Sequence, residues 1–490
     1  MVLVLQTIGR IGTSMNKYYF LVLILGLVNP ISAQNDTIDF EKEFNSFSKQ
    51  QANEYTQFKD KINAEFAVFL KQNWEQFTIE KPIEKPLQPK PKKPIRFIPN
   101  KEDTTNPHIP EEQTPKKEPK DTIVPKKQVP VSIPKGIDTY TFLFFNTEIP
   151  FRKSNCLTIQ CEGYTENAVS TYWTDVTKSD YTDLIAELQH CKATYQLNDW
   201  AMYLFIKKIA EDLHTDKNTQ IALQFFCLTQ LGYDTKIGRV EEQLVLLINF
   251  QQMVYNVSYL NIQNKKYFIP TDINNRSIYS FQNEFKGANA TINLEIHATP
   301  KINYTLKSRN LNFQDTKLSI QYPMEMVDFY ANIPSTDFSV LFNSSINPLT
   351  EKALIESLSP FIQGKTEREA VSLLLSFVQE SFEYQTDQAQ FGSEKYFFVE
   401  DILNYPYSDC EDRSVFFAYL VRRILHLEVI GLSYPKHIAT AVRLSETQVG
   451  ATIEYNEKTF TICDPTYIGA PAGECMPEFV GMQPKVIEIR

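Results

Sequence analysis

Apolar residues recur at helical spacing in the first part of this chain. From residue 37 to residue 78, aromatic and aliphatic side chains return mostly every three or four positions, and neither Gly nor Pro interrupts the run. The opposite face carries Lys, Glu, Gln and Asn. Segment 34–80 is therefore predicted to be one long amphipathic helix, which docks on its own protein or pairs with a protein partner such as a second copy. The apolar positions are Phe40, Phe44, Phe47, Tyr55, Phe58, Ile62, Phe66, Phe69, Trp74 and Phe77.

The pattern is lost in residues 81–136, which hold 13 of the 27 prolines together with many Lys, Glu and Thr. Such a segment cannot bury enough apolar surface to form a core. It is predicted to be an extended, partly polyproline linker.

Two modules are predicted between the linker and residue 350. Residues 137–275 alternate strand and helix patterns, which predicts an α+β module. Its clearest elements are a strand at Tyr140–Phe145, helices at Tyr181–Tyr195 and Trp200–Leu213, a further helix from about residue 218, and strands near Val257 and Tyr267. Residues 276–350 alternate apolar and polar positions, which predicts a β-rich module, a small sandwich. Its apolar triplets are Ile292/Leu294/Ile296, Leu318/Ile320/Tyr322 and Phe338/Val340/Phe342.

Residues 351–490 return to helices before ending in strands. Thr366 followed by Glu369 is a capping-box pattern ahead of an apolar helix. A second apolar helix is predicted from Ser414 to about Leu427. The predicted strands cover residues 429–432, 437–444, 451–455 and 459–463. The predicted fold class is therefore α+β.

One stretch of the chain resembles another. Residues 222–238 align without gaps on residues 415–431, and each copy is followed by strands. This indicates an internal duplication, although any helix–strand–strand unit gives a similar match by chance. In a true duplication the earlier copy has lost its chemistry, because Lys217 stands at the position of Cys410 and no His stands where His437 would be.

The N-terminus predicts export. Met15 is a second candidate start, and Lys17, a short apolar core and Ala33 have the order of a secretory signal (residues 1–33) cleaved after Ala33. An uncleaved N-terminal anchor is the alternative. The expected mature protein is secreted or periplasmic and has no membrane span. A net charge of −10 without a basic stripe argues against binding of nucleic acid.

Export bears on the seven cysteines. In an oxidising compartment Cys156 could pair with Cys161, and Cys463 with Cys475, because each pair is close in sequence. The odd number leaves one thiol unpaired, as a catalytic cysteine requires.

Cys410, His437 and Asp464 form the candidate chemistry. Cys410 precedes an apolar helix, whose N-terminal dipole and unpaired N–H groups favour the thiolate. His437 opens one predicted strand and Asp464 closes another, so an antiparallel sheet could bring them together. Small residues at 439 and 441 are expected to leave room for the helix. The carboxylates of Asp409, Glu411 and Asp412 oppose the thiolate form. They are interpreted as helix caps or as partners of arginines, namely Arg413, Arg422 and Arg423.

In this order and spacing the segments "DCEDRSVFFAYLVR", "HIATAV" and "CDPTY" resemble the transglutaminase-like superfamily over about residues 355–480. The resemblance implies a papain-like core, with Cys410 as nucleophile, His437 as general base and then acid, and Asp464 as the residue that orients it. Family members often have an aromatic residue soon after the His, which is absent here. For the upstream residue that stabilises the oxyanion, the candidates are Gln388, Gln390 and Tyr407.

The predicted function is cysteine-dependent acyl transfer on a peptide or protein substrate, in a peptidase or amidase that needs no metal or organic cofactor. Hydrolysis and transfer remain open. The alternative is a non-catalytic surface or periplasmic binding protein that keeps the fold without the chemistry.

Overall fold

A 35-residue helix, α3 (Asp36–Leu70), opens the part of the chain that the computed structural model describes. The described residues are 36–72, 74–85, 94–98, 124–126, 138–271, 273, 277–446 and 449–490. The predicted signal segment, residues 1–33, lies outside them. The chain divides into two units between Ile62 and Asn63. No helix in the described residues is long and apolar enough to cross a membrane.

The C-terminal end of α3 differs from the sequence prediction. The helix ends at Leu70, so Trp74 and Phe77 lie beyond it, before and within strand β1 (Glu75–Thr78). Strand β1 pairs with β9 (Ser277–Ser280), and Trp74 packs on Phe281. Tertiary contacts with a sheet therefore replace the last turns of the predicted helix.

Only part of the predicted apolar face of α3 is buried. Phe66 and Leu70 are buried, and the Phe66 ring contacts Trp173 at 4.9 Å between ring centroids. By contrast, Phe47 and Phe58 are 58% and 49% exposed. The C-terminal turns of the helix thus dock on their own unit, as one of the two sequence alternatives proposed.

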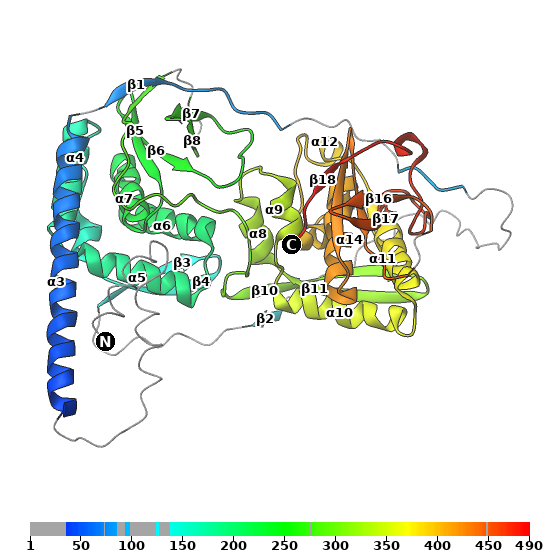
Figure 1. The fold of residues 1–490 in the computed structure, drawn as a ribbon. Coiled ribbons are helices and arrows are strands. Elements are labelled where there is room, and N and C mark those ends of the chain that lie inside the picture. The colour runs from blue at the N-terminus through cyan, green and yellow to red at the C-terminus, as the bar shows by residue number, and fades with distance from the viewer. Residues whose placement is uncertain are drawn as a thin grey trace. The chain divides into compact units, whose positions relative to one another are not determined.

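The first module packs helices against a six-stranded sheet. Helix α7 lies against β5 and β6 (Figure 1). Every residue of its second half, from Gln224 to Gln230, is buried. A separate hairpin precedes the helices. The helices are η1 (Asn155–Thr158), α4 (Glu166–Thr177), α5 (Tyr181–Thr194), α6 (Asp199–Leu213) and α7 (Lys217–Gln230). The hairpin is β3 (Thr139–Phe144) and β4 (Thr147–Arg152), and the sheet order is β1, β9, β5 (Thr235–Val240), β6 (Gln243–Asn249), β8 (Lys265–Phe268), β7 (Tyr259–Ile262).

The predicted sandwich at 276–350 is wrong. Strands β10 (Tyr304–Phe313) and β11 (Thr316–Pro323) form a hairpin, while β9 belongs to the first module. The triplet at 338–342 is helical, in α9 (Phe338–Asn343), since Leu341 also gives it a three- and four-residue spacing. The triplet at 292–296 makes only an isolated bridge, at Ile292. A further helix of this region is α8 (Met324–Ala331).

The hairpin is part of the C-terminal module, because α10 packs on β11 and α11 packs on β10 (Figure 1). The capping box of α11 is confirmed, with Thr366 and Glu369 exchanging hydrogen bonds of 2.9 and 3.3 Å. The helix predicted to begin at Ser414 begins at Cys410, and its last residues form a π-helical turn. The helices are α10 (Pro348–Ile362), α11 (Glu367–Ser381), α12 (Asp387–Gln390), α13 (Val399–Asn404), α14 (Cys410–Leu420), the π turn η2 (Val421–Leu425) and η3 (Pro477–Phe479).

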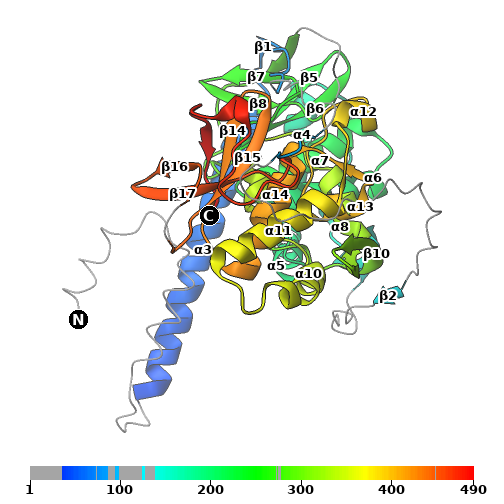
Figure 2. The same ribbon diagram turned by 90° about the vertical axis from the view of Figure 1, so that its right-hand side faces the viewer.

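The C-terminal sheet is antiparallel, and α14 packs against its strand β15 (Figure 2). All four strands predicted for this region are present within one or two residues at their ends. Two short strands, β12 (Glu383–Tyr384) and β13 (Tyr407–Ser408), pair beside the start of α14. The sheet order is β16 (Thr452–Tyr455), β17 (Lys458–Cys463), β15 (His437–Val442), β14 (Val429–Tyr434), β18 (Lys485–Ile487).

The two modules share one strand order. In each, a helix is followed by two hairpins, and the sheets read β9-β5-β6-β8-β7 and β18-β14-β15-β17-β16. Strands β9 and β18 occupy equivalent positions, because each pairs antiparallel with the first strand after the helix. In the first module β1 pairs with the other side of β9. A duplicated unit gives this repetition, so the topology supports the duplication that the sequence indicated.

Parts of the predicted linker have defined partners. Residues 95–97 lie along the loop after β17, where the Phe97 N–H donates to the carbonyl of Ile468 at 2.9 Å. Strand β2 (Val124–Lys126) pairs with β10. The described pieces of residues 81–136 therefore run against the modules rather than forming a free spacer.

Replacing Phe66 by Ala should destabilise the first module by about 3–5 kcal/mol, because the ring is buried among other aromatic rings. The three tryptophans of the chain are Trp74, Trp173 and Trp200. All three lie in this module, so urea unfolding followed by tryptophan fluorescence reports on it. Val68→Ala, at a position 59% exposed on the same helix, should change the stability by less than about 0.5 kcal/mol. Equal effects of the two substitutions would contradict the docking of α3.

Candidate active site

Cys410 is the first residue of α14, with Asp409 as the residue before the helix. Asp412 fixes this helix start. Its Oδ2 accepts the N–H of Asp409 at 3.1 Å, and its Oδ1 accepts the N–H of Phe397 at 3.1 Å. Asp412 therefore caps the helix, as one sequence interpretation proposed, and it also attaches the preceding loop.

Two of the arginines suggested as partners of these carboxylates bind elsewhere. Arg422 donates to the carbonyl of Phe342 at 3.1 Å, and Arg423 pairs with Glu351 at 2.6 Å. Both arginines lie in η2, beyond the C-terminal end of α14, whereas the thiol is at the N-terminal end of that helix.

The Glu411 carboxylate is a direct neighbour of the thiol. Cys410 Sγ donates to Glu411 Oε2 at 3.1 Å, and both residues are 1% exposed. A buried carboxylate at this distance favours the protonated thiol over the thiolate. The sequence interpretation counted Glu411 among the carboxylates that oppose the thiolate, as a cap or a partner of an arginine, but did not predict this direct contact. A position within the first turn does not define which way the side chain points.

His437 and Asp464 meet as the strand pairing requires. His437 opens β15 and Asp464 follows β17, and the two strands pair with Thr440 opposite Cys463. His437 Nε2 and Asp464 Oδ2 lie 2.7 Å apart, and both side chains are buried. The other carboxylate oxygen, Oδ1, accepts the N–H of Thr466 at 2.9 Å. The carboxylate is therefore held from two sides with one oxygen aimed at the imidazole.

The charge of Asp464 changes the titration of the imidazole. Burial lowers the pKa of His437, but the charge and hydrogen bond of Asp464, with smaller contributions from Glu411 and Glu478, outweigh burial and raise the pKa above 6.5. Asp464 therefore makes the imidazole of His437 a stronger base than a free imidazole.

An aromatic ring covers His437, although no aromatic residue follows the His closely in the sequence. Phe479 of η3 stacks on the imidazole with 5.0 Å between centroids and 4° between planes, and Phe479 also stacks on Tyr434. The sequence around His437 did not predict this ring, because Phe479 comes from a later loop of the chain.

The helix with the thiol adjoins the strand that His437 opens. Ser414 Oγ, one turn after Cys410, donates to the carbonyl of Ile438 at 3.0 Å. Cys410 and His437 are therefore at the same end of the α14–β15 contact.

The expectation that small residues of β15 receive the helix is wrong. Ile438 and Val442 cluster with the apolar residues of α14, whereas Ala439 and Ala441 cluster with Phe479 and other side chains of the C-terminal loops. Successive strand residues point to opposite faces, so only one of these two sets can face the helix.

Arg413 adds a buried positive charge that the sequence interpretation did not assign to the site. Its Nη2 donates to the carbonyl of Phe382 at 2.5 Å, its Nε donates to Ser408 Oγ at 3.2 Å, and its guanidinium lies over the Tyr384 ring. Burial lowers the pKa of Arg413 to about 10, while Tyr384, Asp409, Asp412 and Cys410 act in the opposite direction. The group remains a cation that interacts electrostatically with the thiol.

Two of the three oxyanion candidates, Gln388 and Gln390, lie in α12, and the third, Tyr407, lies in β13. Gln388 is exposed, and its Nε2 donates to the carbonyl of Gly392 at 3.1 Å. Gln390 is half-buried, and its Oε1 has no hydrogen-bond partner among the described residues. Tyr407 is half-buried on β13, three residues before Cys410. Gln388 is engaged elsewhere, so Gln390 and Tyr407 are the better-placed candidates.

Several carboxylates lie close enough to share a cation. Oxygens of Asp387, Asp409 and Asp412 are all within 4.8 Å of one another. However, these groups also accept backbone N–H groups: that of Lys395 at Asp387 (2.9 Å), that of Asp387 at Asp409 (3.4 Å), and two at Asp412. Hydrogen bonding to the loop before α14 accounts for this cluster without a metal ion.

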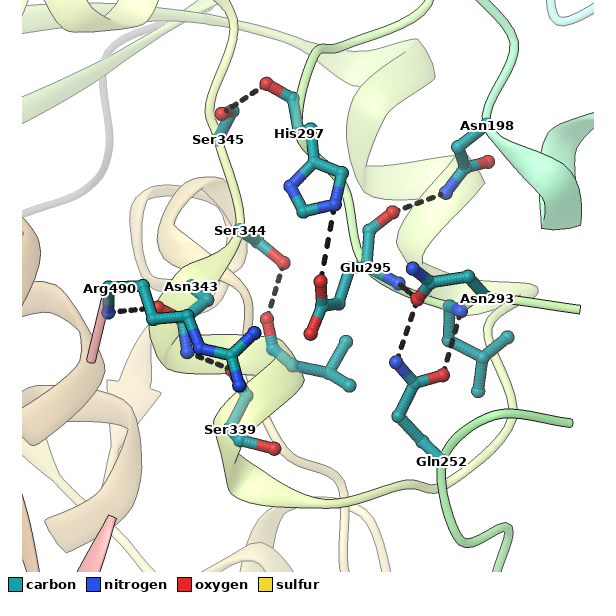
Figure 3. Close-up of polar contacts among 12 residues, drawn as sticks. Asn198, Gln252, Asn293, Glu295, His297, Ser339, Asn343, Ser344, Ser345 and Arg490 are labelled. Atoms are coloured by element: carbon teal, nitrogen blue, oxygen red, sulfur yellow. Dashed lines mark hydrogen bonds and ion pairs between the residues drawn. The ribbon is translucent and has the colours of Figure 1, made fainter. Parts of the chain in front are cut away.

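A cavity of about 560 Å³ reaches the residues next to the thiol and the imidazole. Glu411 and Ile438 line it, each one position after Cys410 and His437. Its rim includes Glu295, Asn343 and Arg490, and Figure 3 shows the polar contacts that hold them. Glu295 Oε2 pairs with His297 at 3.2 Å, and the Arg490 N–H donates to Asn343 Oδ1 at 2.6 Å.

All seven cysteines lie in the described part of the chain and none of them is in a disulfide, so the two suggested disulfides are not formed. Cys156 Sγ instead contacts Asp180 Oδ1 at 3.2 Å, and Cys161 Sγ contacts the carbonyl of Gly163 at 3.5 Å. Cys475 is the one thiol of the seven that is not fully buried.

The matching positions of the first module carry different residues. Lys217 begins α7 where Cys410 begins α14, and its Nζ contacts Gln220 Oε1 at 3.1 Å. By the same alignment Leu244 and Thr271 stand where His437 and Asp464 stand. Comparisons of the chain with protein-family models, with curated proteins and with solved structures find no match.

Asp464→Asn should lower the pKa of His437, because the carboxylate charge is what raises it. A raised pKa contributes stability that is fully present below the unfolded value of 6.5 and is lost as the pH rises through the folded value. The wild type should thus exceed the variant in stability most at pH below 6.5, and the difference should shrink above that. NMR titration of the imidazole, assigned with His437→Gln, checks the first point and urea unfolding at several pH values checks the second. A wild-type pKa at or below 6.5 would contradict the assignment.

Proposed function

We propose that the chain is an exported, thiol-dependent acyl-transfer enzyme, a peptidase or amidase whose C-terminal domain is of the transglutaminase-like, papain type. One observation carries the proposal: the buried 2.7 Å contact of His437 Nε2 with Asp464 Oδ2, beside a helix that begins with Cys410. Nucleophile, base and orienting group then come from a helix start, a strand start and a strand end.

In the first half of the reaction, Cys410 Sγ transfers its proton to His437 Nδ1, since Nε2 is engaged by Asp464. The thiolate attacks the carbonyl carbon of a peptide or amide bond. The N–H of Cys410 at the helix start stabilises the oxyanion, assisted by Gln390 or Tyr407. His437 then protonates the leaving amine, and the C–N bond breaks to give a thioester.

In the second half, His437 accepts a proton from water, or from an amine, as that molecule attacks the thioester carbonyl. The C–S bond breaks and the thiol regains its proton. Water gives a carboxylic acid and an amine gives a new amide. The cavity at Glu411 and Ile438 is the proposed entry for both reactants.

Glu411 and Arg413 oppose each other in this scheme. The Glu411 carboxylate stabilises the protonated thiol of the resting state, while the buried Arg413 cation favours the thiolate. The thiol loses its proton when its hydrogen bond to Glu411 Oε2 is broken, either by a bound substrate or by a change in the conformation of the Glu411 side chain.

The second candidate is a non-catalytic binding protein of the same fold. Deep burial favours it, because Cys410, His437 and Asp464 are only 1%, 2% and 3% exposed. The first module keeps the same sheet order without a thiol at its helix start, so the fold itself does not require the chemistry. In this version the exposed part of α3 binds the partner.

Cys410→Ala should remove the fastest reaction of the protein with iodoacetamide at pH 7, lowering the rate at least tenfold. The other thiols are slow at this pH, since burial raises the pKa of Cys475 to about 11 and that of Cys161 to about 12. Mass spectrometry of labelled peptides measures each site. Cys475→Ser is the matched control and should leave the fast reaction unchanged. Unaltered fast labelling of Cys410→Ala would exclude Cys410 as the nucleophile. Cleavage of a peptide library by that variant would show that the peptidase activity does not depend on Cys410.

Glu411→Gln should speed the alkylation of Cys410 by roughly tenfold, equal to about 1.4 kcal/mol, because it removes a negative charge beside the thiolate. The rate is measured between pH 6 and 9 with the same reagent. Glu457→Gln makes the same charge change at an exposed position in the turn between β16 and β17 and should leave the rate within about twofold. A slower reaction of Glu411→Gln would instead assign Glu411 a role as the base that takes the thiol proton.

A further inference from the structure

The cavity beside the thiol already holds a side chain of this protein. Lys85, from the Pro-rich segment, lies among three aromatic rings, with its Nζ 3.4 Å from the centroid of Tyr396, 4.1 Å from that of Phe338 and 5.6 Å from that of Tyr255. The Nζ also donates to the carbonyl of Thr336 at 2.7 Å. All four residues Lys85, Tyr255, Phe338 and Tyr396 line the same cavity as Glu411. We call the three rings the aromatic cage.

The chemistry of the aromatic cage selects a compact cation. Ring faces attract a positive charge, and a backbone carbonyl fixes one N–H of an ammonium group. The cavity wall also carries the carboxylates of Glu295, Asp337 and Glu488. Asp337 stabilises the cage directly, because its Oδ1 accepts the hydroxyl of Tyr255 at 2.9 Å. A neutral side chain of the same length would gain none of these interactions.

The segment that carries Lys85 lies on the first module as an extended peptide. The N–H of Glu80 donates to the carbonyl of Tyr259 at 2.8 Å, and the N–H of Asn256 donates to the carbonyl of Ile83 at 2.9 Å. Backbone hydrogen bonds with one side chain in a pocket are how extended peptides bind along a strand edge. Residues 80–85 therefore occupy the position of a bound peptide with a lysine in the cage.

The aromatic cage is attached to the thiol-bearing helix. Tyr396 precedes Phe397, whose N–H donates to Asp412 Oδ1 at 3.1 Å in the first turn of α14. Glu411, between Asp412 and Cys410 in the chain, lines the cavity and accepts the hydrogen bond of the Cys410 thiol. A peptide with its lysine in the cage thus lies in the cavity that ends next to Cys410.

We propose that the aromatic cage is a recognition subsite for a lysine side chain of a peptide ligand, and that Lys85 occupies it as an internal competitor. The inference deepens the proposed function, on which it rests, by naming the ligand class and its regulation. The bound lysine is a protonated hydrogen-bond donor here, so it serves recognition and is not the attacking amine. Displacement of residues 80–85 would open the cavity toward the thiol.

Calorimetry with the full chain tests the subsite, with Cys410→Ala in every protein so that no covalent chemistry contributes. The probe is Nα-acetyl-lysine N-methylamide, and Nα-acetyl-norleucine N-methylamide is its neutral isostere. Lys85→Ala should bind the lysine probe at least tenfold more tightly than the protein with Lys85, and it should show no such gain for norleucine. Lys81→Ala, an exposed lysine of the same segment, should give no gain.

Changes of the cage itself complete the test. In the Lys85→Ala protein, a further Tyr396→Ala should abolish the gain in lysine binding, whereas Tyr396→Phe should retain it because the ring remains. Equal lysine affinities with and without Lys85, or an equal gain for norleucine, would overturn the proposal.

A separate measurement distinguishes this proposal from the catalytic one. With Cys410 present, Lys85→Ala should alkylate at Cys410 several-fold faster than wild type. A gain in lysine binding together with an unreactive Cys410 would keep the subsite and reject the thiol chemistry. A reactive Cys410 without the gain in lysine binding would keep the thiol chemistry and reject the subsite.

Discussion

One buried carboxylate, that of Asp412, sets the position of the thiol-bearing part of the candidate site. A charge that is buried in protein is tolerated only when hydrogen bonds replace water, and Asp412 obtains them from the N–H groups of Asp409 and Phe397. The first of these bonds fixes the start of α14, and therefore Cys410. The second holds the loop that ends with Tyr396 and Phe397 against the same helix turn. The thiol, its neighbour Glu411 and one wall of the aromatic cage thus depend on a single side chain.

Local patterns predicted those parts of the fold that local physics determines. The strands of the last module and the capping box at Thr366 and Glu369 were predicted from alternation and capping residues, and they are present. The run at 338–342 was predicted to be a strand, but its apolar spacing fits the period of a strand and that of a helix equally. Packing then determines that the run is a helix. Likewise, α3 ends at Leu70 rather than near residue 78 because Trp74 and β1 find partners in a sheet formed by residues far along the chain.

The contacts of the candidate site likewise divide into those that local sequence patterns could predict and those that they could not. The contact of His437 with Asp464 could be predicted, since a strand start and a strand end meet in any antiparallel pairing of β15 and β17. The stacking of Phe479 on the imidazole could not, because the ring comes from a loop after the last predicted strand. Arg413 was interpreted only as a partner of the neighbouring carboxylates, because its position within the helix did not indicate that its charge would be buried.

The two modules separate what the fold needs from what a site needs. In the first, the carboxylate of Asp216 caps α7 by accepting the N–H of Thr219 at 2.7 Å, and the helix begins with a lysine. In the second, Asp412 provides the capping contact at α14, so the thiol of Cys410 is not required to start the helix. Keeping a carboxylate in contact with a buried thiol, and a guanidinium one turn away, costs stability that apolar residues at the same positions would avoid. Buried ionisable groups that folding does not require are more common at functional sites than elsewhere. The contrast between the two helix starts therefore favours a chemical role for the second one.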